Sequence, residues 1–313
     1  MRWSLTISVA FAAVLSCHSV QAAELIPVAP IAGSTFMSVY DVNDNNTIAG
    51  YYGTSDGHQH AYFGPWSGPY TVFDFGSTYT QARGINDAGY ITGVADVNGT
   101  RTQFERSPDG QITVITKDGN PITLEYLQGI NSQGIFVGNY RDANNRQKAY
   151  YGQDGQYLKD FTLPNGSPAQ PRGINDAGDV SGSSGYSGFI LKGDVATFVH
   201  AITSAPSFTA FEGINKKGNL VSGYWIDVNF TREHPVLFDT QLNAFMPIEI
   251  PGSANGAALG MNGAGLVAVV SDVGPFIYCP YPKSSRKCPA GGIDVPDPVP
   301  LRAAVRRVRI VDK

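Results

Sequence analysis

Charge is scarce in this sequence: Asp, Glu, Lys and Arg make up 15% of the 313 residues, and the formal net charge is −4. No broad basic field is present to attract phosphate backbones, which argues against nucleic acid as a partner. Sustained helical apolar spacing is also lacking, because Gly or Pro interrupts it. Gly (36 residues), Tyr (16) and Phe (16) are abundant instead, a composition typical of short strands and tight turns.

Motifs of catalytic chemistry are missing as well. The sequence has no Gly-x-Ser-x-Gly elbow and no phosphate-binding loop, and its glycines fall at turn positions, where positive φ accounts for them. His58 and His60 would share a strand face and could bind a metal together with Asp56. Because such a site needs three or four ligands, we expect no metal centre there.

The first 22 residues have the pattern of a signal peptide. Arg2 gives the positive start, Leu5 to Leu15 the apolar region, and Val20-Gln21-Ala22 the cleavage site. A loose lipobox ending at Cys17 leaves lipid anchoring as an alternative. We expect an extracellular or periplasmic protein whose mature chain has no integral membrane segment.

Only two cysteines remain beyond this leader, Cys279 and Cys288. An even pair in an exported protein predicts a disulfide. It would close a short loop and contribute about 2–3 kcal/mol in the chain-entropy account. A metal-binding role for the pair lacks histidine partners nearby.

A short pattern recurs along the chain. An apolar stretch ends at an Asn, and Asn-x-x-Gly then forms a tight turn, because Asn favours the first turn position and Gly accepts positive φ at the last. The copies begin at Asp41, Gly84, Gly129, Gly173, Gly213 and Gly260, with their asparagines at 43, 86, 131, 175, 215 and 262. The asparagines are thus 43, 45, 44, 40 and 47 residues apart.

Each copy has room for four short strands, which is the content of a propeller blade. We therefore predict an all-β fold: a six-bladed β-propeller of four-stranded antiparallel blades over residues 23–280. A β-solenoid is the alternative, but its coils are usually shorter.

The last copy offers only three strands before the cysteine loop, at 257–261, 266–271 and 275–278. The segment Glu24 to Val28 precedes the first copy, at the place of a fourth strand. We predict that it completes the final blade and closes the ring, which removes an open sheet edge. Residues 281–313 would then form a disulfide loop and a C-terminal tail. The basic cluster of this tail is interpreted as a solvated last strand or a frayed end; it consists of Arg302, Arg306, Arg307, Arg309 and Lys313.

The repeat resembles a known bacterial family. Gly84 to Gly93 and Gly173 to Gly182 match Gly-Ile-Asn-Asp-x-Gly-x-x-x-Gly, and His60-Ala61-Tyr62 matches the following His-Ala-aromatic element. These stretches resemble the HAF repeat, the "probable extracellular repeat", over roughly residues 38 to 280. The resemblance implies a repeat fold and export, and it transfers no catalytic residue.

Variation within the repeat points to a site. One position, just before each Gly-Ile-Asn turn, differs from copy to copy and should lie on the first strand, which lines the channel of a propeller. Its six residues are Tyr40, Arg83, Gln128, Arg172, Glu212 and Leu259. We interpret the first five as a ligand-binding ring. Charge compensation, for example of Arg172 by Glu212, is the alternative.

Three functions remain open. The first is a monomeric, non-catalytic protein that binds a glycan, a peptide or a surface partner on one ring face. The second is a secreted carbohydrate-active hydrolase or lyase; such enzymes commonly need two acids, and only Glu212 occurs in the ring. The third is a structural cell-surface repeat. We expect no cofactor, although a structural calcium ion in the channel is compatible with the fold.

Overall fold

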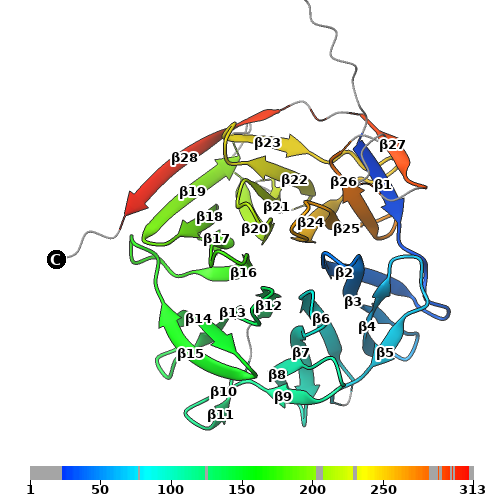
Figure 1. Ribbon diagram of the computed structural model, residues 1–313, viewed down its shortest axis with the longest axis vertical. Coiled ribbons are helices and arrows are strands. Elements are labelled where there is room, and N and C mark those ends of the chain that lie inside the picture. Colours follow the sequence, from blue (N-terminus) through cyan, green and yellow to red (C-terminus); the bar gives the residue numbers. More distant parts are fainter. Residues whose placement is uncertain are drawn as a thin grey trace, which may run out of the picture.

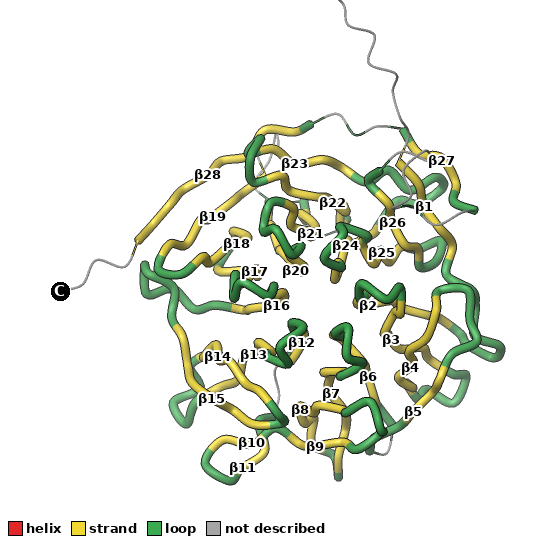
Figure 2. The backbone as a smooth tube through the Cα atoms, viewed as in Figure 1, coloured by secondary structure: helices red, strands yellow, loops and turns green. Residues whose placement is uncertain are grey.

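Six blades are arranged radially around a central axis (Figure 1), and they form five hydrogen-bonded sheets because two neighbouring blades share one. The computed structural model describes residues 23–76, 78–123, 126–201, 207–227, 231–281, 288, 291–296, 298 and 300–309. The expected signal peptide and Cys17 lie outside these residues. Within the described chain every regular element is a strand, so none of its segments is a helix able to cross a membrane (Figure 2).

Each blade has four antiparallel strands, which follow one another in sequence order outward from the channel in every blade except blade 6, whose outer strand is the N-terminal one. Blades 1 and 2 are formed by β2 (Phe36–Val42), β3 (Thr47–Gly53), β4 (Gln59–Pro65), β5 (Thr71–Phe73), β6 (Thr80–Ile85), β7 (Ile91–Val97), β8 (Thr100–Arg106) and β9 (Ile112–Val114). Blades 3 and 4 are formed by β12 (Leu127–Ile130), β13 (Phe136–Arg141), β14 (Gln147–Gln153), β15 (Gln156–Phe161), β16 (Gln170–Ile174), β17 (Val180–Ser184), β18 (Ser187–Lys192) and β19 (Val195–Ala201). Blades 5 and 6 are formed by β20 (Phe208–Ile214), β21 (Leu220–Ile226), β22 (Glu233–Asp239), β23 (Ala244–Pro247), β24 (Gly256–Met261), β25 (Val267–Ser271), β26 (Phe276–Cys279) and β1 (Ala23–Pro27).

The predicted fold and its closure are confirmed. The N-terminal strand β1 pairs antiparallel with β26, with Leu25 opposite Tyr278, and so supplies the fourth strand of blade 6. Leu25 is fully buried, and Ile26 is almost so. Because the two side chains face different core clusters, β1 is held by its packing as well as by the hydrogen-bond ladder.

Further strands cover several outer edges, which the repeat pattern did not predict. The hairpin of β10 (Thr116–Lys117) and β11 (Asn120–Pro121) adjoins β15, and β27 (Ile293–Val295) pairs with β1. The tail strand β28 (Leu301–Arg309) pairs with both β19 and β23 and so joins blades 4 and 5. These strands saturate edges that would otherwise offer unpaired backbone groups.

In blades 2 and 3 a glycine of the second strand packs against an aromatic side chain of the third strand. Gly93 on β7 lies under the ring of Phe104 on β8, where an added Cβ would stand 2.8 Å from the ring. Gly138 and Tyr150 repeat this arrangement in blade 3. The glycine therefore makes room for a large, fully buried aromatic side chain in the blade core.

Candidate functional site

The repeat asparagines form a belt around one end of the channel, which we call the turn end. Each Asn closes its own turn, as when Asn86 Oδ1 accepts from the Tyr90 amide at 3.0 Å. Its Nδ2 also donates to the carbonyl of the next blade's Asn, from Asn86 to Asn131 at 3.0 Å. Equivalent bonds run from Asn43 to Asn86, Asn131 to Asn175, Asn175 to Asn215 and Asn262 to Asn43. Asn215 departs from this pattern, because its Nδ2 donates to Asn219 Oδ1 within its own blade.

The first glycine of each repeat copy is required for a reason other than the positive φ that the sequence suggested. The final glycines of the turns do have positive φ, for example 86° at Gly89, but Gly84 does not. A Cβ on Gly84 would stand 2.0 Å from the carbonyl oxygen of Gln128 on the neighbouring blade. The leading glycines therefore let adjacent first strands approach, and attributing them to turn geometry was wrong.

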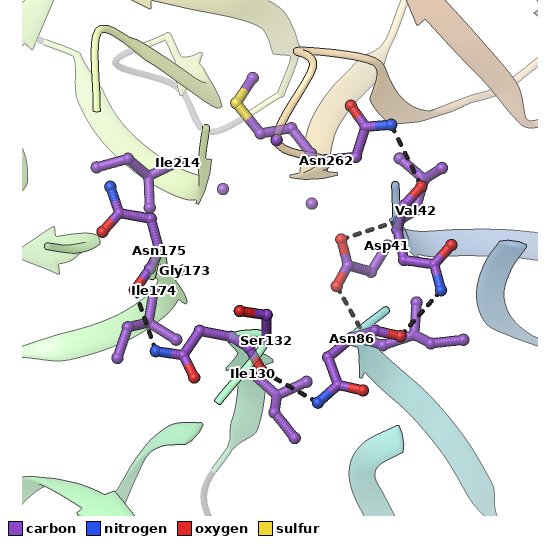
Figure 3. A pocket seen from close by; sticks show the side chains of 18 of the residues that line it. Asp41, Val42, Asn86, Ile130, Ser132, Gly173, Ile174, Asn175, Ile214 and Asn262 are labelled. Carbon is purple, nitrogen blue, oxygen red and sulfur yellow. Dashed lines mark hydrogen bonds between the residues drawn. The ribbon is translucent and has the colours of Figure 1, made fainter. Parts of the chain in front are cut away.

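Asp41 takes the place of this glycine in blade 1. Its carboxylate accepts hydrogen bonds from the amides of Val42 (2.8 Å) and Ile85 (3.0 Å), so it links blades 1 and 2. Burial, with a further contribution from the charge of Asp87, raises the pKa of Asp41 to about 7. In Figure 3 its side chain projects into the channel.

A β-bulge directs the predicted ring residues towards the channel. In blade 1 the register shifts between Val39 and Asp41, so Tyr40 is the extra residue of its strand. Arg83, Arg172 and Glu212 occupy the same bulged position in blades 2, 4 and 5. Bulges commonly re-aim a side chain in this way.

Three of the predicted ring residues form one hydrogen-bonded group. Glu212 Oε2 accepts from Gln128 Nε2 at 2.7 Å and lies 3.5 Å from Arg172 Nη1. The same Arg172 nitrogen donates to Gln128 Oε1 at 3.1 Å. Burial alone would lower the pKa of Arg172, but Glu212 together with the neighbouring Tyr224, Tyr40 and Tyr126 raises it above the usual value. Charge compensation thus does occur between Arg172 and Glu212.

Arg83 lies beside this group with a different set of contacts. Its Nε and Nη2 both donate to Gln81 Oε1, at 3.0 and 2.6 Å. Its guanidinium carbon lies 5.0 Å from the ring centre of Tyr40 and 4.5 Å from that of Tyr126. Among the described residues no carboxylate lies within ion-pair distance of Arg83, which is 6% exposed. We call Tyr40, Arg83, Gln128, Arg172 and Glu212 together the channel bed.

Sequence reasoning missed several side chains around this bed. Tyr51 and Tyr224 occupy equivalent positions on the second strands of blades 1 and 5, and Tyr126 contacts both arginines. Burial raises the pKa of Tyr51 and of Tyr224, and Glu212 adds to the effect at Tyr224. Comparing second strands as well as first strands would have singled out the two tyrosines.

A second acid was also missed. Burial and the nearby charge of Glu212 raise the pKa of Glu233, on the third strand of blade 5. The ring position alone could not identify it, because it comes from a different strand. The carboxyl groups of Glu212 and Glu233 therefore interact electrostatically although their residues are far apart in the repeat pattern.

The two ends of the channel differ in charge. Between the bed and the turn end lies a cavity of about 80 Å³ (Figure 3). Its lining includes the charged residues Asp44, Asp87, Asp176 and Lys216. The opposite end, which we call the strand-start end, carries Tyr51, Tyr126 and Tyr224 beyond the bed. A cavity of this size takes a functional group or a few waters, not a whole drug-sized ligand.

The remaining predicted residues have simpler surroundings. Leu259, the sixth ring residue, is buried and offers no polar side-chain group. Cys279 and Cys288 form the predicted disulfide. His60 pairs with Asp74 at 2.9 Å rather than with His58. No cluster of three His, Cys, Asp or Glu side chains suited to a metal ion is present in the described part of the chain.

Fold and site together define the chain as a six-bladed β-propeller with a polar, tyrosine-flanked channel bed. No family model matches the sequence, and no curated protein is significantly similar to it. Among solved structures it is similar to AofleA from Arthrobotrys oligospora (11% identity, 94% of each chain, TM-score 0.42). It is also similar to virginiamycin B lyase from Staphylococcus aureus (9% identity, 85% of this chain and 89% of that one, TM-score 0.36).

Proposed function

We propose that the protein is an exported, non-catalytic propeller that binds a saccharide at the strand-start end of its channel. The observation that carries this proposal is the convergence of blade-specific polar side chains from four blades beneath partly exposed tyrosine rings. Aromatic faces stack on sugar rings, while a few converging polar groups fix orientation. Phe36 is 46% exposed and packs edge-on against Tyr51, extending the aromatic surface.

Export is part of the same proposal. The leader-like first 22 residues and the likeness of the repeat to the HAF repeat support it, and the Cys279–Cys288 disulfide is typical of an oxidising compartment. N-terminal sequencing of protein recovered outside the cytoplasm should give a start at Ala23. A start at Met1 would contradict export by cleavage.

A glycan array probed with the mature protein, followed by calorimetry on the best ligand, tests the binding function. Tyr126→Ala should weaken binding about tenfold, because this ring contacts both arginines of the bed. Tyr186→Ala is the matched control, since Tyr186 is 69% exposed and belongs to no bed contact described above. Silence of the wild-type protein across the array contradicts the proposal and favours a structural repeat.

A hydrolase or lyase is the second candidate, and one observation favours it. Glu212, which is ion-paired with Arg172, and Glu233, whose pKa is raised by burial and by Glu212, have different environments, as the two acids of glycosidases do. Reducing-end release from bound glycans is the assay. Catalysis requires that Glu212→Ala and Glu233→Gln both abolish turnover; binding without any wild-type turnover rejects this candidate.

A further inference from the structure

Arg83 stands out because no carboxylate among the described residues lies within ion-pair distance of it. A guanidinium has five N–H donors, and the two that Arg83 directs at Gln81 share a single oxygen. No acceptor for the other three occurs among the described residues. A buried cation without a counter-ion is costly. Arg172 also has a buried Nε without a hydrogen-bond partner, but its charge is offset by Glu212.

The surroundings of Arg83 fix its orientation. The rings of Tyr40 and Tyr126 both lie within cation–π range of its guanidinium. Gln81 is itself held by donating from Nε2 to Gln59 Oε1 at 2.7 Å. Such a clamped, planar guanidinium is preorganised for two parallel hydrogen bonds to a carboxylate.

The charges at the two ends of the channel indicate from which end an anionic ligand approaches Arg83. The two arginines and the ion-paired Glu212 give the five bed residues a net positive formal charge, and Glu233 is a further acid near Glu212. The turn end is lined by Asp41, Asp44, Asp87 and Asp176 with Lys216, so it is the more acidic end and an anion is favoured from the strand-start end. Tyr40 occupies the same repeat position as Arg83, whereas Gln81 and Tyr126 come two residues before that position in their blades. The contacts of Arg83 are therefore level with it or closer to the strand-start end.

We infer that Arg83 is the receptor for the carboxylate of an acidic saccharide, a uronate, which enters from the strand-start end and stacks on the tyrosines. The inference rests on the proposed saccharide-binding function and adds the class of ligand. A uronate brings the sugar ring that the aromatic side chains fit and the anion that Arg83 lacks.

Calorimetry with matched oligosaccharides tests the inference. The probes are trisaccharides of galacturonate, glucuronate and mannuronate, each beside its carboxyl-reduced neutral counterpart. At least one acidic trisaccharide should bind, and its neutral counterpart should bind about 10- to 100-fold more weakly, the effect of losing a charge-assisted buried contact. This comparison uses only the wild-type protein and needs no variant to fold.

Substitution provides the second arm. Arg83→Met should reduce affinity for the acidic trisaccharide to that for the neutral one. Arg101→Met is the matched control: Arg101 also lies over a tyrosine ring, 4.4 Å from the centre of Tyr79, but is exposed and outside the bed. Thermal melts establish that both variants fold.

The outcomes separate the two proposals. Equal affinity for acidic and neutral trisaccharides overturns the uronate inference and leaves saccharide binding intact. Silence towards all trisaccharides and the glycan array contradicts both. Arg83-dependent binding of an Asp- and Glu-rich peptide, with no saccharide bound, also overturns the inference.

Discussion

The side-chain amide of Asn262 donates a hydrogen bond to the main-chain carbonyl of Asn43, 219 residues earlier in the chain, at 3.2 Å. This bond joins the last blade to the first at the turn end. Together with the pairing of β1 and β26, it closes the ring at two levels. The repeated Asn is therefore both a turn residue and a connector between blades.

The belt predicts unequal effects of equivalent substitutions. Asn131→Ala removes the turn contacts of Oδ1 and the bond to the Asn175 carbonyl, whereas Asn215→Ala removes turn contacts and a bond within its own blade. Both variants lose the same kinds of bond, but the Asn131 bond ends on the buried Asn175, whereas Asn219 is partly exposed and can bond to water. We therefore expect Asn131→Ala to lower the free energy of unfolding by about 1 kcal/mol more. Urea denaturation of both variants measures the difference, and equal losses would show that the inter-blade bond contributes nothing.

Ring closure by β1 predicts a large loss when the strand is removed. Deleting residues 24 to 30 exposes the edge of β26 and two core clusters, so the melting temperature should collapse. Leu25→Ala is the milder change and should cost about 2–5 kcal/mol. Leu242→Ala is its control: Leu242 is 66% exposed and should change stability by less than about 0.5 kcal/mol. An unchanged melting temperature after the deletion would refute closure by this strand.

Removal of the tail strand β28 should destabilise the strand edge that it covers and leave distant blades unchanged. Truncation after Pro300 exposes the edge of β19, whose residues Val195 to Ala201 all have partners in β28. Amide exchange in this segment should accelerate while β7 in blade 2 keeps its protection. Hydrogen-exchange mass spectrometry distinguishes this from global destabilisation, in which both segments would accelerate.

The raised pKa of Asp41 predicts that the stability of the folded protein depends on pH. Its pKa is raised from 3.8 to about 7 on folding, so between these values the folded state binds more protons than the unfolded state. Stability from this group is therefore fully present below about pH 4 and is lost as pH rises towards 7, by roughly 1.4 kcal/mol per unit. Asp41→Asn should flatten that part of the stability–pH curve in urea melts. A slope identical to that of the wild type would mean that other groups cause it, Glu105 among them, since burial raises its pKa to about 7 as well.

Much of the candidate site could be predicted from the first strands alone. Residues at the position that varies between copies do lie together: the side chains of Gln128, Arg172 and Glu212 form one hydrogen-bonded group. Tyr224 and Glu233 could not be found in this way, because they come from the second and third strands of blade 5. Their approach to Glu212 depends on how the blade twists around the channel, which the repeat spacing does not contain.

The sequence by itself determined the number of blades, their four-strand content, the closing strand and the disulfide, because period, turn residues and alternation are local properties of the chain. Only the tertiary structure decided which charges meet. It paired Arg172 with Glu212 and left Arg83 between two tyrosine rings, although both arginines occupy the same position of the repeat. The difference arises because each ring residue is surrounded by side chains of neighbouring blades, and those contacts form only when the blades pack side by side.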